Sequence, residues 1–363
     1  MSKRVEQGAY AQFRKSIMVP VLDNKNMPLM PCSEKRARHL MINKAAISYW
    51  QKGIFCIKLI KGPSSRNYQE VALGIDPGSK REGYTVITNK LVVLNITTNT
   101  PDWVKTHIET RRVLRRSRRQ RKTPYRMCRS NRSVKNRIPP STKARWGAKL
   151  RIIKQLINIL PISIINVEDV AAVSKTGKRK WNISFSPLEV GKAWFYNEIV
   201  KLQISLIKTK GFDTYTYRKQ RGFSKSKNKL DFKWEAHNSD SHSLAEMAIK
   251  TQIKPYYGLY QIEFLEYYRR QLHIQQPQKG NIRKQYGTTV SLKLSRGSVA
   301  KYKNKLVYIG GNSKGKIAIH NILTGKRIKQ YTDIKEIQIM HITKQRSQFL
   351  PRLKSWVSLR DFS

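Results

Sequence analysis

The chain has 363 residues, of which 73 are Lys or Arg and 22 are Asp or Glu, so its formal net charge is +51. Such a charge would repel itself in a compact protein unless a polyanion neutralised it, which points to nucleic acid as the partner and leaves an anionic membrane surface as the alternative. No apolar run approaches the roughly 20 residues of a membrane-spanning helix, no signal peptide is recognisable, and the three cysteines have neither disulfide nor zinc spacing, so we expect a soluble, intracellular protein that binds no membrane.

Residues 1–66 predict a small mixed domain. "MVPVL" is typical of a short strand that ends in an Asp-Asn turn, and "PLMPC" follows as a Pro-bounded segment. "SEKRARHLMINKAAI", residues 33–47, predicts a basic helix with Ser33 as its N-cap. "GIFCIKLI", residues 53–60, predicts a strand.

Residues 67–104 predict three strands in a meander, namely "EVALGID", "GYTVIT" and "LVVLNITT", joined by the turns "PGSKREG" and "NK". The first strand ends on Asp76. A carboxylate beside an apolar run is costly unless it is paired or binds a metal. Asp76 is therefore a candidate for a site as well as for a turn.

Residues 105–140 predict a basic helix. The stretch from 111 to 137 is rich in Lys and Arg, holds no acid, and is flanked by structured segments. A solvated or disordered tail is the alternative for such a run. We favour a helix lying along nucleic-acid phosphates, with these binding residues: Arg111, Arg112, Arg115, Arg116, Arg118, Arg119, Arg121, Lys122 and Arg126.

Residues 141–252 predict helices alternating with strands. An apolar face with spacings of three and four, from Trp146 to Leu160, predicts an amphipathic helix that Pro161 stops. "ISIINVED" then predicts a buried strand ending on Glu168. Residues 186–211 predict one long helix, with Ser186 as cap and Gly211 after its end, and "DTYTYR", residues 213–218, predicts a strand.

The last part of this region predicts a basic loop and a helix. "SKSKNK" carries Lys225, Lys227 and Lys229, which we expect to line a groove for a nucleic-acid strand. "KWEAHNSDSHSLAEMAIK" predicts a helix in which His237 and Asp240, three residues apart, share one face. In residues 253–363, short alternating segments such as "NKLVYIGG", "GKIAIHNI" and "KEIQIMHI" predict a small β-barrel or sheet.

Four side chains at the ends of these elements form one candidate site: Asp76, Glu168, His237 and Asp240. Singly, each has an ordinary interpretation, because Asp before Pro-Gly is usually a turn residue, Glu168 could pair with Arg, and a lone histidine is usually packed. Together they favour a site for two Mg²⁺ or Mn²⁺ ions about 4 Å apart that clamp an in-line phosphodiester displacement. Asp76 would bridge the ions, Glu168 and Asp240 would be outer ligands, and His237 would be a ligand or the base acting on water.

Several motifs in this order resemble those of the IscB and IsrB group, transposon-encoded RNA-guided nucleases. "PLMP" matches the motif of the group's N-terminal domain, "ETRRVLRRSRRQRKTPYR" resembles the bridge helix of the RRXRR domain, and "LGIDPGSK", "NVED" and "EAHNSDSHSLA" resemble the three RuvC motifs. "SPLEVGKAWFYNE" and "RGFSKSKNK" resemble the remainder of the nuclease. The resemblance runs from about residue 17 through the C-terminal domain, and it implies that Asp76, Glu168, His237 and Asp240 are catalytic.

The resemblance also implies a fold. We expect an α/β, RNase H-like (RuvC) core interrupted by an Arg-rich bridge helix. A small N-terminal α+β domain would precede this core, and a small C-terminal β-barrel domain, a candidate reader of a target-adjacent motif, would follow it.

One departure from the pattern indicates the subgroup. IscB carries an HNH nuclease between the second and third RuvC motifs, whereas residues 169–236 here are already filled by the predicted RuvC helix and strand. The chain therefore resembles IsrB, the RuvC-only form. This implies Mg²⁺-dependent nicking of the non-target DNA strand by a monomeric protein in a complex with a guide RNA, in a bacterial cytoplasm or an algal chloroplast.

Two alternatives remain open. The chain could be a non-catalytic RNA- or DNA-binding protein that uses a RuvC fold as scaffold, since fold does not guarantee chemistry. The presence of all four candidate side chains argues against this. It could also be an unguided, structure-specific nuclease such as a junction resolvase, which would need neither the bridge helix nor the C-terminal domain.

Overall fold

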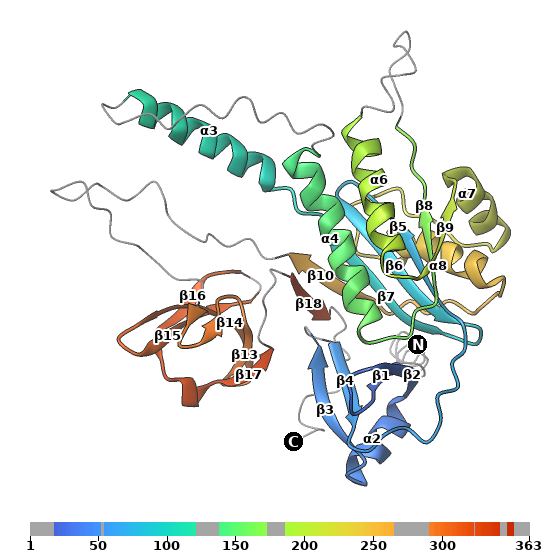
Figure 1. Ribbon diagram of the computed structural model, residues 1–363, viewed down its shortest axis with the longest axis horizontal. Helices are drawn as coiled ribbons and strands as arrows, with labels where there is room; N and C mark the ends of the chain where they lie inside the picture. The colour runs from blue at the N-terminus through green and yellow to red at the C-terminus, as the bar shows by residue number, and fades with distance from the viewer. Residues whose placement is uncertain are drawn as a thin grey trace, which may run out of the picture.

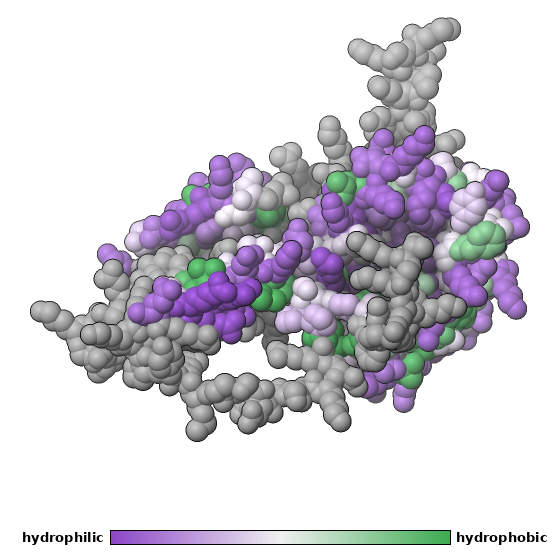
Figure 2. All heavy atoms as spheres, turned by 90° about the horizontal axis from the view of Figure 1, so that it is seen from above, coloured by the Kyte–Doolittle hydropathy of each residue, from purple (hydrophilic) through white to green (hydrophobic). Residues whose placement is uncertain are grey.

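The computed structural model describes residues 18–51, 54–120, 138–172, 186–264, 290–322, 324–341 and 347–351. Figure 1 shows three groups of elements: a small N-terminal sheet, a large central sheet with helices on both faces, and a C-terminal sheet. Hydrophilic side chains predominate on the face seen in Figure 2. Arg121, Lys122 and Arg126, predicted to bind nucleic acid, lie outside the described residues.

The N-terminal group is a four-stranded sheet with one helix. It contains β1 (Met18–Leu22), β2 (Pro28–Ser33), α2 (Glu34–Ile42), β3 (Ala46–Gln51) and β4 (Ile54–Leu59), with the strand order β2-β1-β4-β3. The Ser33 hydroxyl accepts a hydrogen bond from the Arg36 N–H at 3.3 Å, which confirms the predicted cap. The helix predicted through residue 47 is too long, because Lys44 takes a left-handed φ of 53° and the chain from Ala46 pairs with β4.

The central sheet has the strand order β18-β10-β7-β6-β5-β8-β9. Its strands are β5 (Val71–Asp76), β6 (Arg81–Thr88), β7 (Val92–Asn99), β8 (Ile164–Glu168), β9 (Ser205–Thr209), β10 (Tyr260–Phe264) and β18 (Ser347–Pro351). The predicted meander of β5, β6 and β7 is antiparallel, and β8 and β9 run parallel to β5. The order β7-β6-β5-β8-β9 with these directions is that of RNase H-like nucleases, so the RNase H-like α/β core of the predicted fold class is confirmed.

Two strands of this sheet come from residues 253–363, the range expected to form the C-terminal domain. β10 pairs with β7, and β18 pairs with β10. The C-terminal part of the chain thus extends the central sheet as well as forming a sheet of its own.

The two faces of β5 carry different helices. Val71, Leu73 and Ile75 face the main core together with residues of α4 (Pro140–Ile157) and α6 (Pro187–Val200). The alternate residues of β5 face α8 (Trp234–Ile249), the predicted last helix of the core. The sheet is therefore covered on both sides, and Asp76, at the end of β5, lies on the side of α8.

The segment between residues 186 and 220 differs from its prediction. The helix α6 begins after its Ser186 cap as expected but ends at Val200, and β9 and a further helix, α7 (Gly211–Gln220), follow it. The prediction of one helix over 186–211 and a strand over 213–218 is wrong. In α7 the buried residues are Thr214 and Arg218, four apart, so tertiary packing overrides the strand preference of its Thr and Tyr residues.

The C-terminal group is a five-stranded antiparallel sheet with the order β16-β15-β14-β13-β17. Its strands are β13 (Val299–Tyr302), β14 (Lys305–Ser313), β15 (Lys316–Asn321), β16 (Arg327–Thr332) and β17 (Gln338–His341). Short strands β11 (Val290–Ser291) and β12 (Leu294–Ser295) and the 3-10 helix η1 (Ile334–Glu336) accompany it. A separate core that includes Val307, Ile309 and Ile319 stabilises this sheet.

The predicted basic helix is present as α3 (Val104–Gln120), which projects away from the central sheet in Figure 1. Arg111, Arg112, Arg115 and Arg116 are exposed. Arg118 and Arg119 lie in its last turns. Within the described part of the chain, no helix is long and apolar enough to cross a bilayer.

Candidate active site

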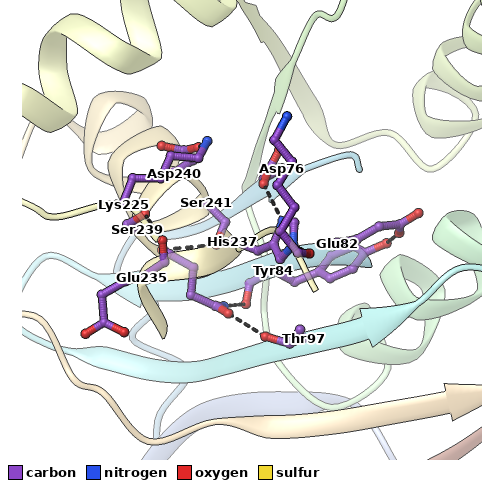
Figure 3. A network of polar contacts seen from close by, with 12 residues as sticks. Asp76, Glu82, Tyr84, Thr97, Lys225, Glu235, His237, Ser239, Asp240 and Ser241 are labelled. Carbon is purple, nitrogen blue, oxygen red and sulfur yellow. Dashed lines mark hydrogen bonds and ion pairs between the residues drawn. The ribbon is translucent and has the colours of Figure 1, made fainter. Parts of the chain in front are cut away.

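The four candidate side chains meet at one edge of the central sheet. β5 and β8 are adjacent and parallel, with Ile75 opposite Val167, so Asp76 and Glu168 both lie where their strands end. The Glu168 carboxyl lies close enough to the Asp76 carboxyl for the charge of Asp76 to raise the pKa of Glu168. His237 and Asp240, on the first turns of α8, are directed toward the same region, as Figure 3 shows. Residues far apart in the chain thus form one acidic cluster.

Two glycines allow α8 to lie very close to the sheet. A Cβ added at Gly74 of β5 would be 1.9 Å from the Ser241 carbonyl oxygen, and one added at Gly83 of β6 would be 2.5 Å from the His237 carbonyl oxygen. Contacts this short are impossible for a real side chain, so both positions need glycine for the close approach of the helix. The two glycines therefore set the distance between the sheet and the helix that carries His237 and Asp240.

Buried polar contacts fix α8 in this position. Asn238 Oδ1 accepts from the Thr97 hydroxyl at 2.7 Å, and the Ser241 and Thr85 hydroxyls are 2.8 Å apart. The amide of Asn166 in β8 donates to the Leu244 carbonyl at 2.8 Å. These bonds satisfy groups that would otherwise be buried without partners, so they favour one register of the helix on the sheet.

His237 is held between two acceptors. Its Nδ1 lies 3.1 Å from Asp76 Oδ2, and its Nε2 lies 2.9 Å from the Lys229 carbonyl oxygen. Burial lowers the pKa of His237, but the hydrogen bond and charge of Asp76 outweigh it, so the net shift is upward. The protonated ring, which donates from both nitrogens, suits this environment. In this arrangement His237 orients Asp76.

Asp240 is surrounded by cations. The Lys225 ammonium bonds to Asp240 Oδ2, and Arg218 Nε lies 2.8 Å from Asp240 Oδ1. Only 2 % of Asp240 is exposed, and its Oδ1 atom has no well-directed hydrogen bond. Burial raises the pKa of Asp240, and the charge of Asp76 adds to this, while Lys225 and Arg218 oppose it.

Glu168 lies against the start of α7. A Cβ at Gly211, the first residue of α7, would be 2.8 Å from Glu168 Oε1, so this glycine leaves room for the carboxyl group. Burial, followed by the charge of Asp76, raises the pKa of Glu168 to about 8. Two carboxyl groups that crowd each other in this way are stabilised by a nearby cation.

The chemistry of these ligands fits a divalent cation. Within the residues that the structure describes, no three His, Cys, Asp or Glu side chains are arranged closely enough to hold a metal ion. However, Asp76 and Glu168 offer hard carboxylate oxygens whose mutual repulsion a cation would relieve, and Asp240 Oδ1 has no well-directed partner. Carboxylate oxygens are the ligands that Mg²⁺ and Mn²⁺ prefer. Asp76 and Glu168 would hold the ion, with Asp240 beside them.

The basic loop before α8 is placed beside this cluster, but its three lysines differ. Lys227 and Lys229 are exposed, and the groove that they were expected to line stays a prediction. Lys225 is instead engaged by Asp240. Arg218 was not identified from the sequence, because it lies in the segment that was predicted as a strand. The only sequence signal for Arg218 was its place at the end of "DTYTYR", a short segment that contains aromatic residues and precedes further basic ones.

Comparisons with known proteins found one family model and several solved structures of low similarity. The family model described as RRXRR protein matches residues 19–181. No curated protein matches the chain. Thermus thermophilus RuvC in complex with a Holliday junction substrate is 12 % identical, covers 48 % of this chain and 90 % of its own, and has a TM-score of 0.27. The yeast mitochondrial Holliday junction resolvase Ydc2 is 13 % identical over 50 % of this chain and 78 % of its own, also with a TM-score of 0.27.

At these TM-scores the fold assignment rests on the strand order of the central sheet and not on the solved structures. The family match is independent of that order and covers the N-terminal sheet, β5 to β7, α3, α4 and β8. It also spans "PLMP", "LGIDPGSK", "ETRRVLRRSRRQRKTPYR" and "NVED", four of the motifs on which the resemblance was based. Residues 19–181, somewhat less than half of the chain, are therefore similar to the family described as RRXRR protein.

Proposed function

We propose that this protein is a divalent-metal-dependent DNA endonuclease of the IsrB type, directed by a guide RNA, that cuts one strand. The observation that carries the proposal is the convergence of Asp76, Glu168, His237 and Asp240 at one edge of an RNase H-like sheet. The RRXRR match and the net charge of +51 support an RNA partner and a DNA substrate.

The chain's own residues have distinct roles in this proposal. A bound Mg²⁺ would supply an activated water and stabilise the leaving 3′ oxygen. Asp76 would be a ligand of that ion, because it lies near Glu168 and contacts His237. His237 orients Asp76 through Nδ1, and its own ring is oriented by the Lys229 carbonyl. Lys225 and Arg218 pair with Asp240 and hold its carboxylate in place.

A single cut follows from the organisation of the chain. Residues 186–236 are filled by α6, β9, α7 and the basic loop, and no second nuclease fold occurs among these described residues. In an RNA-guided complex, the target strand is held in the RNA–DNA duplex, whereas the displaced strand is single and flexible. We therefore expect the displaced, non-target strand to reach the acidic cluster.

The test uses the protein purified with the RNA that accompanies it, after that RNA has been sequenced. A duplex that matches the guide segment carries different labels on its two strands and is incubated with Mg²⁺. The proposal predicts one labelled product, from the non-target strand, and an open-circular product from a supercoiled plasmid. EDTA should abolish both products.

Two results would contradict parts of this proposal. Cutting that needs no RNA would favour an unguided, structure-specific nuclease. Equal cutting of both strands would show that a second site, or a second copy of the chain, takes part. Binding of RNA and DNA with no cutting in either Mg²⁺ or Mn²⁺ would favour the non-catalytic scaffold.

A further inference from the structure

Helix α7 presents two aromatic side chains to solvent beside the acidic cluster. Phe212 is 75 % exposed and Tyr215 is 50 % exposed. They are three residues apart, so they lie on neighbouring positions of one helical face. Single exposed apolar side chains are common, but a phenyl ring this exposed gains nothing from the protein's own core. In Figure 2 a hydrophobic patch bordered by hydrophilic groups lies at the end of the molecule where Figure 1 places α7.

Each ring is next to a residue that contacts a candidate catalytic carboxylate. Phe212 directly follows Gly211, whose Cα carries no side chain because Glu168 Oε1 occupies that space. The Tyr215 ring lies under the Arg218 guanidinium, with the Arg218 Cζ atom 5.5 Å from the ring centroid. Arg218 Nε in turn lies 2.8 Å from Asp240 Oδ1. Both rings therefore stand on the helix whose residues contact Glu168 and Asp240.

The surroundings of the rings are basic. Lys208 and Lys210 are exposed at the end of β9 and just before α7, and Lys219 is exposed at the end of α7. Asp213 is the one acidic residue of this helix. Exposed aromatic rings set among Lys and Arg side chains are how proteins bind single-stranded nucleic acid, because the rings stack on bases and the cations contact phosphates.

We propose that Phe212 and Tyr215 form a stacking platform for bases of the single DNA strand that enters the acidic cluster. This rests on the proposed function, since it assigns a binding surface to the strand that is cut. Duplex DNA is excluded as the occupant because its bases are already stacked on each other. The platform would hold the strand without base preference, since every base has a π-face, and it would position the backbone phosphate next to Asp76 and Glu168.

Cross-linking tests the platform directly. The full-length protein with its accompanying RNA is incubated in EDTA with an oligodeoxythymidine that carries 5-iodouracil at several positions, irradiated, and digested for mass spectrometry. Because stacked rings react with this base at short range, the proposal predicts cross-links to Phe212 or Tyr215. The double substitution Phe212→Leu and Tyr215→Leu keeps apolar side chains but removes the rings. It should lower the yield on α7 and weaken binding of the oligonucleotide by about tenfold.

Two matched variants separate stacking from other effects. Phe212→Trp should preserve both cross-linking and affinity, because a larger ring still stacks. Tyr331→Leu, at a ring that is 43 % exposed on β16, should leave the α7 cross-links unchanged. The slope of log affinity against log salt should not change in the double Leu variant, because no phosphate contact is lost.

The inference is overturned if irradiation gives cross-links elsewhere but none on α7, or if the double Leu variant binds the oligonucleotide as the wild type does. Loss of the accompanying RNA, with DNA binding intact, would also overturn it and assign the platform to RNA. The assay needs no cutting and can be repeated with Asp76→Asn. Cross-linking to α7 in a protein that never cuts DNA would therefore contradict the proposed function alone, whereas cutting without α7 cross-links would contradict only the platform.

Discussion

At the scale of single residues, the candidate site depends on glycines as much as on acids. Gly74 and Gly83 let the backbone of α8 approach β5 and β6 more closely than any side chain would permit, and Gly211 leaves room for Glu168. The acids could be selected from the sequence because each follows or begins a predicted element. The glycines could not, because their role depends on which helix packs on them.

Replacement of Gly74 by Ala should therefore move α8. The added methyl group would meet the Ser241 carbonyl and the Ala245 backbone nitrogen, both of which belong to the helix backbone and cannot rotate away. We expect a loss of about 1–3 kcal/mol in the free energy of unfolding, the usual cost of overpacking. DNA cutting should decrease further than stability does, because His237 and Asp240 move with α8. Urea unfolding and a plasmid-nicking assay measure the two effects.

Gly147→Ala is the control for this prediction. Gly147 lies within α4, and a Cβ there would have no neighbouring atom within 4 Å. Since Ala is the better helix former, this variant should be unchanged or more stable by roughly 0.5–1 kcal/mol. Equal stability of Gly74→Ala and wild type would show that α8 does not pack as closely as described.

At the scale of elements, a buried ion pair joins α7 to α8. Arg221, which directly follows α7, donates to both oxygens of Glu246 in α8, at 2.8 and 3.0 Å, and also to the Ile253 carbonyl. The Ile253 N–H donates to Glu246 Oε1 at 2.6 Å, and His242 Nε2 lies 3.2 Å from the same oxygen. This contact closes the loop that carries Lys225 and Lys229, so it supports the contacts of both lysines with the acidic cluster.

Substitution of Glu246 by Gln should be destabilising in a pH-dependent way. Burial alone would raise the pKa of Glu246, but the nearby His242 ring and the hydrogen bonds from Arg221 and the Ile253 backbone lower it to about 2. A carboxyl group with a lowered pKa in the folded state stabilises the protein above its unfolded pKa, near 4.5. That stabilisation is lost as the pH falls toward the folded value. At pH 7, removal of the charge should cost about 3–5 kcal/mol.

Urea unfolding at several pH values checks this expectation. The difference between wild type and Glu246→Gln should be constant from pH 7 to about pH 5 and should shrink below that. Glu198→Gln, which removes a carboxylate from an ion pair with the exposed Lys201 on the surface of α6, should have little effect at any pH. A Glu246→Gln difference that does not change between pH 7 and pH 3 would contradict the described ion pair.

The same region shows how far sequence reasoning extends. A helix that begins after Ser186 could be predicted between Glu168 and His237, but β9 was taken as part of that helix and α7 was taken as a strand. Gln203, with a left-handed φ of 58°, helps to end the helical path, and Leu206 of β9 packs against the main core. The sequence around Gln203 and Leu206 carries no local signal that would separate it from a continuing amphipathic helix. Arg218 therefore could not be assigned to the site, although Asp76, Glu168, His237 and Asp240 were brought together as expected.

At the scale of the whole molecule, the charge of +51 must be matched by polyanions. α3 is the clearest surface for this, because Arg111, Arg112, Arg115 and Arg116 are exposed on a helix that projects from the central sheet. Such side chains contact phosphates more than base edges. The helix would thus contribute affinity without sequence preference.

Neutral replacement of Arg115, Arg116, Arg118 and Arg119 should flatten the dependence of RNA affinity on salt. Each lost phosphate contact lowers the slope of log affinity against log salt by up to about 0.7–0.9. A filter-binding titration at several salt concentrations measures this slope. Replacement of the same four residues by Lys keeps the charges and should keep the slope. An unchanged slope in the neutral variant would show that α3 does not contact RNA and is a solvated helix.

The most direct measurement of the central claim compares cutting and RNA binding in one protein, Asp76→Asn. Asp76 joins Glu168 and His237, so loss of its charge should remove metal-dependent nicking of a matching plasmid. RNA binding should stay close to wild type, because one carboxylate contributes little to the field of a chain with a charge of +51. Glu198→Gln serves as the control and should nick normally. Full nicking by Asp76→Asn, with its RNA bound, would contradict the assignment of this cluster as the active site.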